Sequence, residues 1–94
     1  MDDLEGVALV TGSSSGIGAA IARRLAASGM TVVINFRSSR REGEPIAREI
    51  RGSYLLADIG DEEQARSLVR GAVDRYSRLH LLVNNAGTTV EIPA

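Results

Sequence analysis

A run of four apolar residues, Val7 to Val10, leads directly into a segment that contains three closely spaced glycines, Gly12, Gly16 and Gly18. Apolar residues then recur at the spacing of one helical face, at Ile17, Ala20, Ile21 and Leu25. A buried strand, a turn that glycine makes without steric cost and a helix starting near Ser15 therefore follow one another. This order restricts the chain to an α/β fold in which helices connect parallel strands.

The glycine-rich turn has the features of a site for the diphosphate of a nucleotide. Unpaired N–H groups at the start of a helix attract phosphate, and glycine allows the backbone to come close. The spacing is Gly-x-x-x-Gly-x-Gly rather than the Gly-x-Gly-x-x-Gly of the general dinucleotide fingerprint. A tight turn without any ligand favours the same residues, so a second landmark is needed. The apolar run 81–83 provides it, because it ends in the small and amide-bearing residues Asn84, Asn85, Ala86 and Gly87.

Turn residues and periodicity indicate two further elements in the middle of the chain. Gly29 lies where a helix C-terminal glycine belongs, and the β-branched run 31–34 begins a second strand. Residues 40–51 carry a narrow apolar stripe and predict a short helix. We expect Pro45 in the first turn of this helix if it starts near Glu44.

The last part of the chain predicts a strand, a helix and a strand. The two strands are expected at residues 54–57 and 80–83. Between them, Asp61 and Gln64 have the spacing of a capping box at the start of a helix. One face of that helix is apolar and comprises Ala65, Leu68, Val69, Ala72, Val73 and Tyr76.

Composition limits the classes of function. A chain of 94 residues forms one domain at most, and its net charge of −1 gives no reason to expect a nucleic acid or an anionic membrane as partner. The acidic start, residues 1–5, is unlike a signal peptide, and no apolar run is long enough to span a bilayer. The absence of cysteine excludes disulfides and thiolate chemistry, and the single histidine, His80, predicts a strand start rather than a metal site. We expect a cytoplasmic protein without a metal.

With both motifs, 11–18 and 84–87, the chain resembles the short-chain dehydrogenase/reductase family, whose signatures are Thr-Gly-x-x-x-Gly-Ile-Gly and Asn-Asn-Ala-Gly. The resemblance runs from Gly6 to Gly87 and is closest to the 3-oxoacyl-[acyl-carrier-protein] reductase type. It implies a partial Rossmann fold, βαβαβαβ, with a doubly wound parallel sheet in the order 3-2-1-4. Residues 1–94 would form an incomplete NAD(P)-binding domain, with two helices on one face, one on the other, and the outer edge of the last strand exposed. Two positions differ from the residues that family members often have: Ser77 lies where a glycine is common, and His80 lies where an aspartate is common.

The end of the second predicted strand indicates which dinucleotide would bind. It reads Asn35-Phe36-Arg37, without the acidic residue that holds the ribose hydroxyls of NAD. A carboxylate would repel a 2′-phosphate, whereas the guanidinium of Arg37 can pair with it, so NADP is favoured over NAD. Arg40 and Arg41 are interpreted as solvated surface residues.

The resemblance also assigns the cofactor-binding residues. Asp58 is implied for the adenine amino group, Ile59 for the adenine wall, and Asn84 for a structural backbone bridge. An ordinary strand-end role for Asp58 remains the alternative. The full expected set is Gly12, Ser14, Ser15, Gly16, Ile17, Gly18, Arg37, Asp58, Ile59, Asn85, Ala86 and Gly87, of which the last three contact the adenosine ribose and the neighbouring phosphate.

The family transfers hydride between NAD(P)(H) and a carbonyl or alcohol, using a Ser and a Tyr-x-x-x-Lys motif. This chain has no lysine, and neither Tyr54 nor Tyr76 belongs to such a motif; Tyr76 fits the helical apolar stripe instead. We therefore predict no catalytic residue and no activity of the chain alone, as expected of a fragment or a truncated reading frame of an oxidoreductase. Two alternatives remain: a non-catalytic nucleotide-binding or assembly module that pairs with a separate partner or forms a homo-oligomer, and a structural protein without ligand. The substrate is not indicated.

Overall fold

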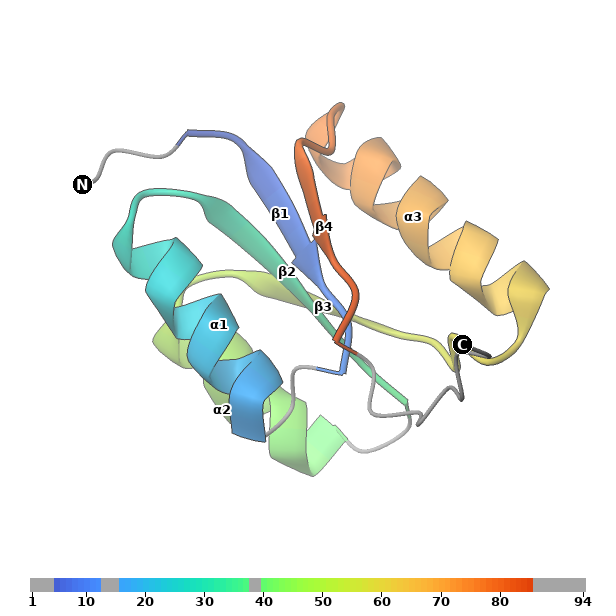
Figure 1. The fold of residues 1–94 in the computed structure, drawn as a ribbon, viewed down its shortest axis with the longest axis horizontal. Helices are drawn as coiled ribbons and strands as arrows, with labels where there is room; N and C mark the ends of the chain where they lie inside the picture. The colour runs from blue at the N-terminus through green and yellow to red at the C-terminus, as the bar shows by residue number, and fades with distance from the viewer. Residues whose placement is uncertain (1–4, 13–15, 38–39, 86–94) are drawn as a thin grey trace, which may run out of the picture.

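A computed structural model describes residues 5–12, 16–37 and 40–85, which form one four-stranded sheet with three helices. The strands are β1 (Val7–Val10), β2 (Thr31–Phe36), β3 (Ser53–Leu56) and β4 (Leu81–Val83). All pair in parallel, in the order β3-β2-β1-β4 (Figure 1). The predicted βαβαβαβ succession and the order 3-2-1-4 are confirmed. β3 begins and ends one residue earlier than expected, and β4 begins one residue later.

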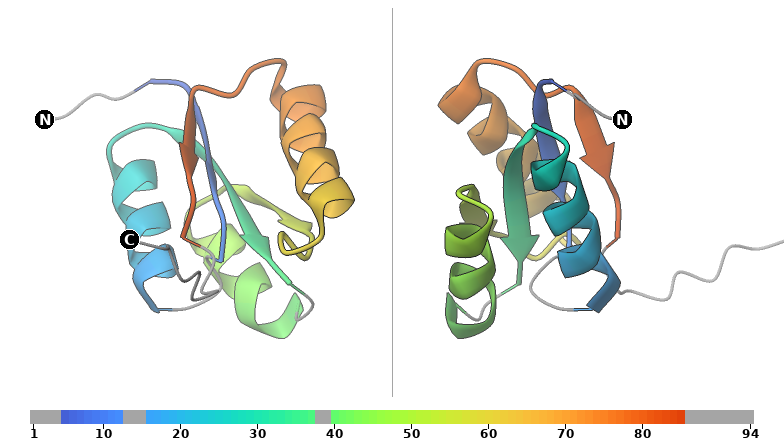
Figure 2. Two further views of the ribbon diagram at one scale, coloured as in Figure 1. Left: turned by 45° about the vertical axis from the view of Figure 1, so that its right-hand side comes forward. Right: turned by 90° about the vertical axis from the view of Figure 1, so that its left-hand side faces the viewer.

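The sheet separates two apolar cores, which is why β1 is apolar at every position. Helices α1 (Gly16–Ala27) and α2 (Arg40–Glu49) cover one face, and α3 (Glu62–Tyr76) covers the other (Figures 1 and 2). Ala8 and Val10 belong to the core under α1 and α2, while Val7 and Leu9 belong to the core under α3. Beyond β1, Leu82 in β4 is 51% exposed, in agreement with the predicted open outer edge.

The buried face of α1 differs from the predicted one. Ile17 is 73% exposed and Ala20 is also exposed, whereas Ile21 and Leu25 are partly buried against the core. The residues that α1 buries fully are small: Gly18, Ala19 and Ala22. Since the glycine turn leaves only a few residues between β1 and α1, the helix lies close to the sheet, and small side chains permit that approach. Side-chain size, which apolar periodicity ignores, therefore determines the orientation of this helix.

The start of α2 also differs from the expectation. The helix begins at Arg40, so Pro45 is its sixth residue and lies inside the helix rather than in its first turn. Proline has no N–H for the carbonyl of Arg41, but this loses a single helical bond near the start of the helix. The apolar stripe itself is correct, because Ile46 and Ala47 are buried against the same core as α1.

The capping box predicted for α3 forms only in part. The carboxylate of Asp61 accepts hydrogen bonds from the backbone N–H of Glu63 (2.9 Å) and of Gln64 (3.3 Å), as an N-cap does. The side chain of Gln64, however, accepts from the N–H of Asp58 (2.8 Å), and the N–H of Asp61 donates to the carbonyl of Asp58 (3.0 Å). Gln64 thus attaches α3 to the segment after β3.

Ser77, directly after α3, lies where the family commonly has a glycine, and its backbone conformation shows why glycine suits this position. Ser77 has φ 68° and donates its N–H to the carbonyl of Val73, so it ends the helix in the left-handed conformation. Glycine adopts this conformation without steric cost, and a serine there is strained.

His80 has a structural role at the start of β4. Its Nδ1 accepts a hydrogen bond from the N–H of Val7 (3.0 Å), and its own N–H donates to the carbonyl of Val7 (2.9 Å). The ring lies against Gly6, where a Cβ would come within 2.8 Å of it and where φ is +113°. His80 was expected to be the first residue of the strand but lies directly before β4, which begins at Leu81, and its ring joins the beginnings of β1 and β4.

Replacing His80 by alanine is expected to lower the free energy of unfolding by about 1–2 kcal/mol, because the partly buried N–H of Val7 loses its acceptor. Urea unfolding followed by circular dichroism measures this change. His80→Asn is the matched control, since its side-chain oxygen can accept the same hydrogen bond and should restore part of the loss. An H80A variant as stable as the unmodified chain would show that the bond contributes nothing.

Candidate binding site at the carboxyl edge of the sheet

All four strands end at one edge of the sheet, hereafter the carboxyl edge, at the bottom of Figure 1. The residues that follow them there are Thr11 and Gly12 after β1, Arg37 after β2, Ala57 and Asp58 after β3, and Asn84 and Asn85 after β4. From β1 the chain crosses to β2 on one side, whereas from β3 it crosses back to β4 on the other. Ligands of open α/β sheets bind in the crevice where the direction of winding reverses in this way.

The described part of the glycine turn has the backbone that close approach to a ligand requires. Gly12 and Gly16 both have φ +61°, which favours glycine. A Cβ at Gly16 would meet no atom within 4 Å, so the space beside the first residue of α1 is open. Gly18 is buried and Ile17 is exposed. Ser14 and Ser15 lie outside the described residues.

Two asparagines hold Gly12 from opposite sides. Its N–H donates to Oδ1 of Asn35 in β2 (3.4 Å), and its carbonyl accepts from Nδ2 of Asn85 after β4 (3.3 Å). Because these neighbours flank β1 on both sides, the residue at which the chain leaves β1 is fixed to both adjacent strands. The side-chain nitrogen of Asn85, expected at the ribose, is therefore engaged with the glycine turn. Its role toward a nucleotide stays a prediction, and Ala86 and Gly87 lie outside the described residues.

Thr11 connects the ends of β1 and β4. Its buried hydroxyl lies 3.3 Å from the carbonyl of Val83 and 3.3 Å from Oδ1 of Asn84, to which it can donate, and it accepts from the N–H of Asn85 (2.9 Å). Asn84 was predicted to bridge backbone segments, whereas its side chain contacts the side chain of Thr11. The sequence interpretation assigned no role to Thr11.

Arg37 and Asp58 lie together at the same edge. Nη2 of Arg37 is 3.6 Å from Oδ2 of Asp58, and their side chains are 79% and 40% exposed. The other carboxylate oxygen of Asp58 accepts from the N–H of Gly60 (3.0 Å), and Ile59 is partly buried against the core under α3. An exposed ion pair of this length adds little stability, so the guanidinium can exchange Asp58 for a stronger anion.

Asn35 is a second site residue, besides Thr11, to which the sequence interpretation assigned no role. It is only 2% exposed, and its Nδ2 donates to the carbonyls of Leu55 (3.1 Å) and Ala57 (3.2 Å) beside β3. One signal was available in the sequence, an amide side chain between Ile34 and Phe36 in an otherwise apolar run. A polar side chain buried in such a run requires hydrogen-bond partners, so it indicates a residue that connects neighbouring segments.

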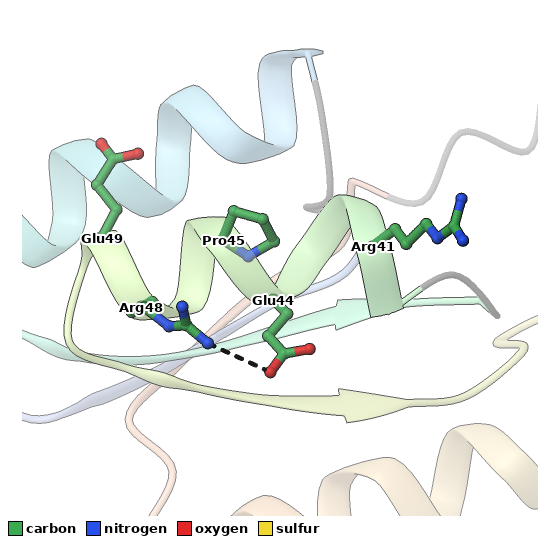
Figure 3. A pocket seen from close by; sticks show the side chains of 5 residues that line it. All are labelled: Arg41, Glu44, Pro45, Arg48 and Glu49. Atoms are coloured by element: carbon green, nitrogen blue, oxygen red, sulfur yellow. Dashed lines mark ion pairs between the residues drawn. The ribbon is translucent and has the colours of Figure 1, made fainter.

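A hollow of about 480 Å³ lies on the outer surface of α2, apart from this site (Figure 3). Its lining consists of Arg41, Glu44, Pro45, Arg48 and Glu49. Two arginines balance two glutamates, and Arg48 is already paired with Glu44 at 3.6 Å. The hollow has no net charge that would select an ionic ligand.

Two further properties concern the described residues only. Within residues 5–12, 16–37 and 40–85, no helix has the length and apolarity needed to cross a membrane. In the same part of the chain, no three side chains among His, Asp and Glu are grouped so that they could hold a metal ion.

Comparison with known proteins identifies relatives across almost the whole chain. Residues 6–94 match the family model described as short chain dehydrogenase. A Streptomyces violaceoruber protein named as a ketoacyl reductase of the granaticin polyketide synthase is 53% identical over 88 residues, which are 93% of this chain and 35% of the relative. The 3-oxoacyl-[acyl-carrier-protein] reductase of Synechocystis sp. is 40% identical over 88 residues, 88% of this chain and 36% of the relative.

A solved structure agrees with this assignment. The short chain dehydrogenase of Burkholderia cenocepacia, determined in complex with NADP, superposes with a TM-score of 0.83 at 39% identity, over 88% of this chain and 36% of that one. The chain therefore spans about a third of the length of the proteins that it matches.

Proposed function

Because the chain belongs to the short-chain dehydrogenase family, we propose that it is the NADP-binding part of an oxidoreductase that transfers hydride to or from a carbonyl or alcohol. The observation that carries this proposal is the glycine turn. It follows β1 at the point where the direction of winding around the sheet reverses, and it precedes α1, where the space beside Gly16 is open. NADP supplies the hydride chemistry when it is bound, and the chain supplies binding and orientation.

We propose the following roles for the residues of the carboxyl edge. The amides at the start of α1 hold the diphosphate, Arg37 pairs with the 2′-phosphate, and Asp58 accepts from the adenine amino group. The complete proposed set is Gly12, Ser14, Ser15, Gly16, Ile17 and Gly18 for the diphosphate, Arg37 for the 2′-phosphate, Asp58 and Ile59 for adenine, and Asn85, Ala86 and Gly87 for the adenosine ribose and the adjoining phosphate. In this view residues 1–94 form an incomplete NAD(P)-binding domain of a cytoplasmic protein.

The preference for NADP over NAD rests on the end of β2. Phe36 is buried and Arg37 is exposed, so a cation rather than an acid is presented beside the edge of the sheet. Guanidinium and phosphate form charge-assisted hydrogen bonds, whereas the ribose hydroxyls of NAD gain nothing comparable from Arg37. The complex of the Burkholderia cenocepacia relative with NADP supports the same choice.

Calorimetric titration of the 94-residue chain tests the binding proposal. We expect saturable binding of NADP, with a dissociation constant about tenfold below that of NAD, which corresponds to roughly 1.4 kcal/mol. Nicotinamide mononucleotide, which lacks the adenosine 2′-phosphate half, is the control and should bind much more weakly than either. Absence of saturable binding of both dinucleotides would refute the proposal.

The chain alone is expected to be catalytically inactive. Its two tyrosines lie toward the start of β3, because Tyr54 is the second residue of that strand and the hydroxyl of Tyr76 is 2.9 Å from the hydroxyl of Ser53, its first. The carboxyl edge is at the opposite end of the strand, so neither phenol can serve a proton transfer there. Consumption of NADPH with a 3-oxoacyl thioester should equal that of a heat-treated sample. A rate above that control would overturn the prediction.

A second candidate is a non-catalytic nucleotide-binding or assembly module. The exposed leucines of β4, Leu81 at 38% and Leu82 at 51%, favour it, because they form the open edge of the sheet next to β1. Such a module would pair with a separate chain or with a second copy. Light scattering of the purified chain distinguishes a homo-oligomer from a monomer, and Leu82→Glu should dissociate an oligomer formed through β4.

A further inference from the structure

Asn35 joins three segments that meet at the carboxyl edge. Its Oδ1 accepts from the N–H of Gly12 (3.4 Å) after β1, and its Nδ2 donates to the carbonyls of Leu55 (3.1 Å) and Ala57 (3.2 Å) at the end of β3. The side chain is 2% exposed. One amide in β2 thus contacts the beginning of the glycine turn on one side and the last residues of β3 on the other.

We propose that Asn35 is a positioning residue that sets the distance between the two halves of the dinucleotide site. The diphosphate half begins at Gly12, and the adenine half begins at Asp58, directly after the carbonyl that Asn35 holds. The inference rests on the proposed function, because it concerns the geometry in which that site binds NADP. It adds a residue that does not contact the cofactor.

The backbone ladder alone does not fix the adenine half. Pairing of β2 with β3 ends at Phe36 and Leu56, followed by one more bond from the N–H of Ala57 to the carbonyl of Phe36 (3.2 Å). The next segment turns away toward α3. The bond from Asn35 therefore holds the carbonyl of the last peptide group before Asp58 to the sheet (3.2 Å), while the N–H of the same peptide group is held by Gln64 of α3 (2.8 Å).

The chemistry of the amide suits this position. A primary amide has two N–H donors and one carbonyl acceptor, and these match the two nearest carbonyls and one backbone N–H, with the carbonyl of Phe36 farther away at 3.5 Å. Aspartate has the same size but would set its oxygens against two carbonyls, and an apolar side chain would leave all three backbone groups without this partner. Burying the polar side chain of Asn35 costs free energy, and this cost is offset only when the side chain bonds to all three backbone groups, the N–H of Gly12 and the carbonyls of Leu55 and Ala57.

The expected consequence is specific to ligands that occupy both halves. When two parts of a ligand are linked, the affinity of the whole depends on how well the two subsites are spaced, whereas each part alone is unaffected by that spacing. We therefore expect Asn35→Ala to weaken the binding of NADP by about tenfold. Inorganic pyrophosphate and adenosine 2′-monophosphate, one probe for each half, should bind the variant within about twofold of the unmodified chain.

Calorimetric titration of the chain with all three compounds makes this test, after circular dichroism has established that each variant is folded. Ser53→Ala is the matched control, because it truncates another buried polar side chain, which lies at the opposite end of β3 and hydrogen-bonds to Tyr76 (2.9 Å), and it should change the affinity for NADP by less than about twofold. Asn35→Ser keeps one donor and should lie between the unmodified chain and N35A. If N35A does not fold, N35S takes its place, with the same comparison between NADP and the two probes.

Two results would overturn the inference while leaving the proposed function intact. In the first, the variant binds NADP as tightly as the unmodified chain. In the second, NADP and both probes weaken by the same factor, which indicates a general loss of structure rather than a change in spacing. Failure of the unmodified chain to bind NADP would instead refute the proposed function, and this inference with it.

Discussion

Alanine at position 43 is expected to destabilise the chain by about 2–3 kcal/mol, although replacing glycine inside a helix ordinarily stabilises by roughly 1 kcal/mol. Gly43 lies in α2 directly against Phe36, and a Cβ there would overlap the ring at Cε1, Cδ1 and Cζ. Phe36 is buried and stacks on Tyr54 with 5.3 Å between ring centroids, so a movement of the ring would disturb this aromatic pair. Either α2 must shift away from the sheet or the aromatic pair must separate.

Thermal and urea unfolding measure this effect, which should lower Tm by about 10–20 °C for a domain of this size. Gly71→Ala in α3 is the matched control. A Cβ at Gly71 would lie 3.3 Å from Cδ1 of Leu55, the end of a flexible side chain, so the gain in helix propensity should offset the contact. Adding Phe36→Leu to G43A should recover part of the lost stability. A G43A variant as stable as G71A would show that α2 does not pack against Phe36 as described.

The topology could be predicted because each strand is a short apolar run, and these runs alternate with helical segments of the sequence. The run from Val7 to Val10 lacks polar residues because helices cover both faces of β1, and this pattern, repeated between helical segments, predicts a parallel sheet. The strand order followed from the family resemblance rather than from periodicity. The orientation of α1 could not be derived in this way, since it depends on the close approach that Gly18 and Ala22 allow and not on the largest apolar residues.

The candidate site was predictable in place but not in its internal contacts. Parallel strands bring their carboxyl ends to one edge, so residues after different strands had to lie near one another. The hydrogen bonds that hold Gly12 come from Asn35 and Asn85, which are 23 and 73 residues away in the sequence. Such contacts depend on strand order and register together, and a slip of one residue would turn Asn35 to the opposite face. Apolar periodicity therefore gave no indication of them.

Reversing the charge at position 37 is expected to reverse the proposed preference for NADP over NAD. Arg37→Glu should raise the dissociation constant of NADP relative to that of NAD by about 100-fold, which corresponds to roughly 2.7 kcal/mol. The variant would lose the proposed charge-assisted hydrogen bonds to the 2′-phosphate and would add a repulsion between two anions. Calorimetric titration with both dinucleotides measures the ratio, and the difference should shrink as salt is added, because the site is exposed.

The ratio, rather than either constant, isolates the role of Arg37. A glutamate at position 37 would also face Asp58, which lies 3.6 Å from the present guanidinium, and the resulting disturbance of the adenine half weakens NADP and NAD alike. Arg41→Glu in α2 is the matched control, since the same change of charge at another exposed arginine should alter the ratio by less than about threefold. If R37E and R41E shifted the ratio equally, the preference would come from the overall charge of the surface. A shift confined to R37E indicates that position 37 lies within about 10 Å of the 2′-phosphate, because salt at 0.1 M screens exposed charges beyond that distance.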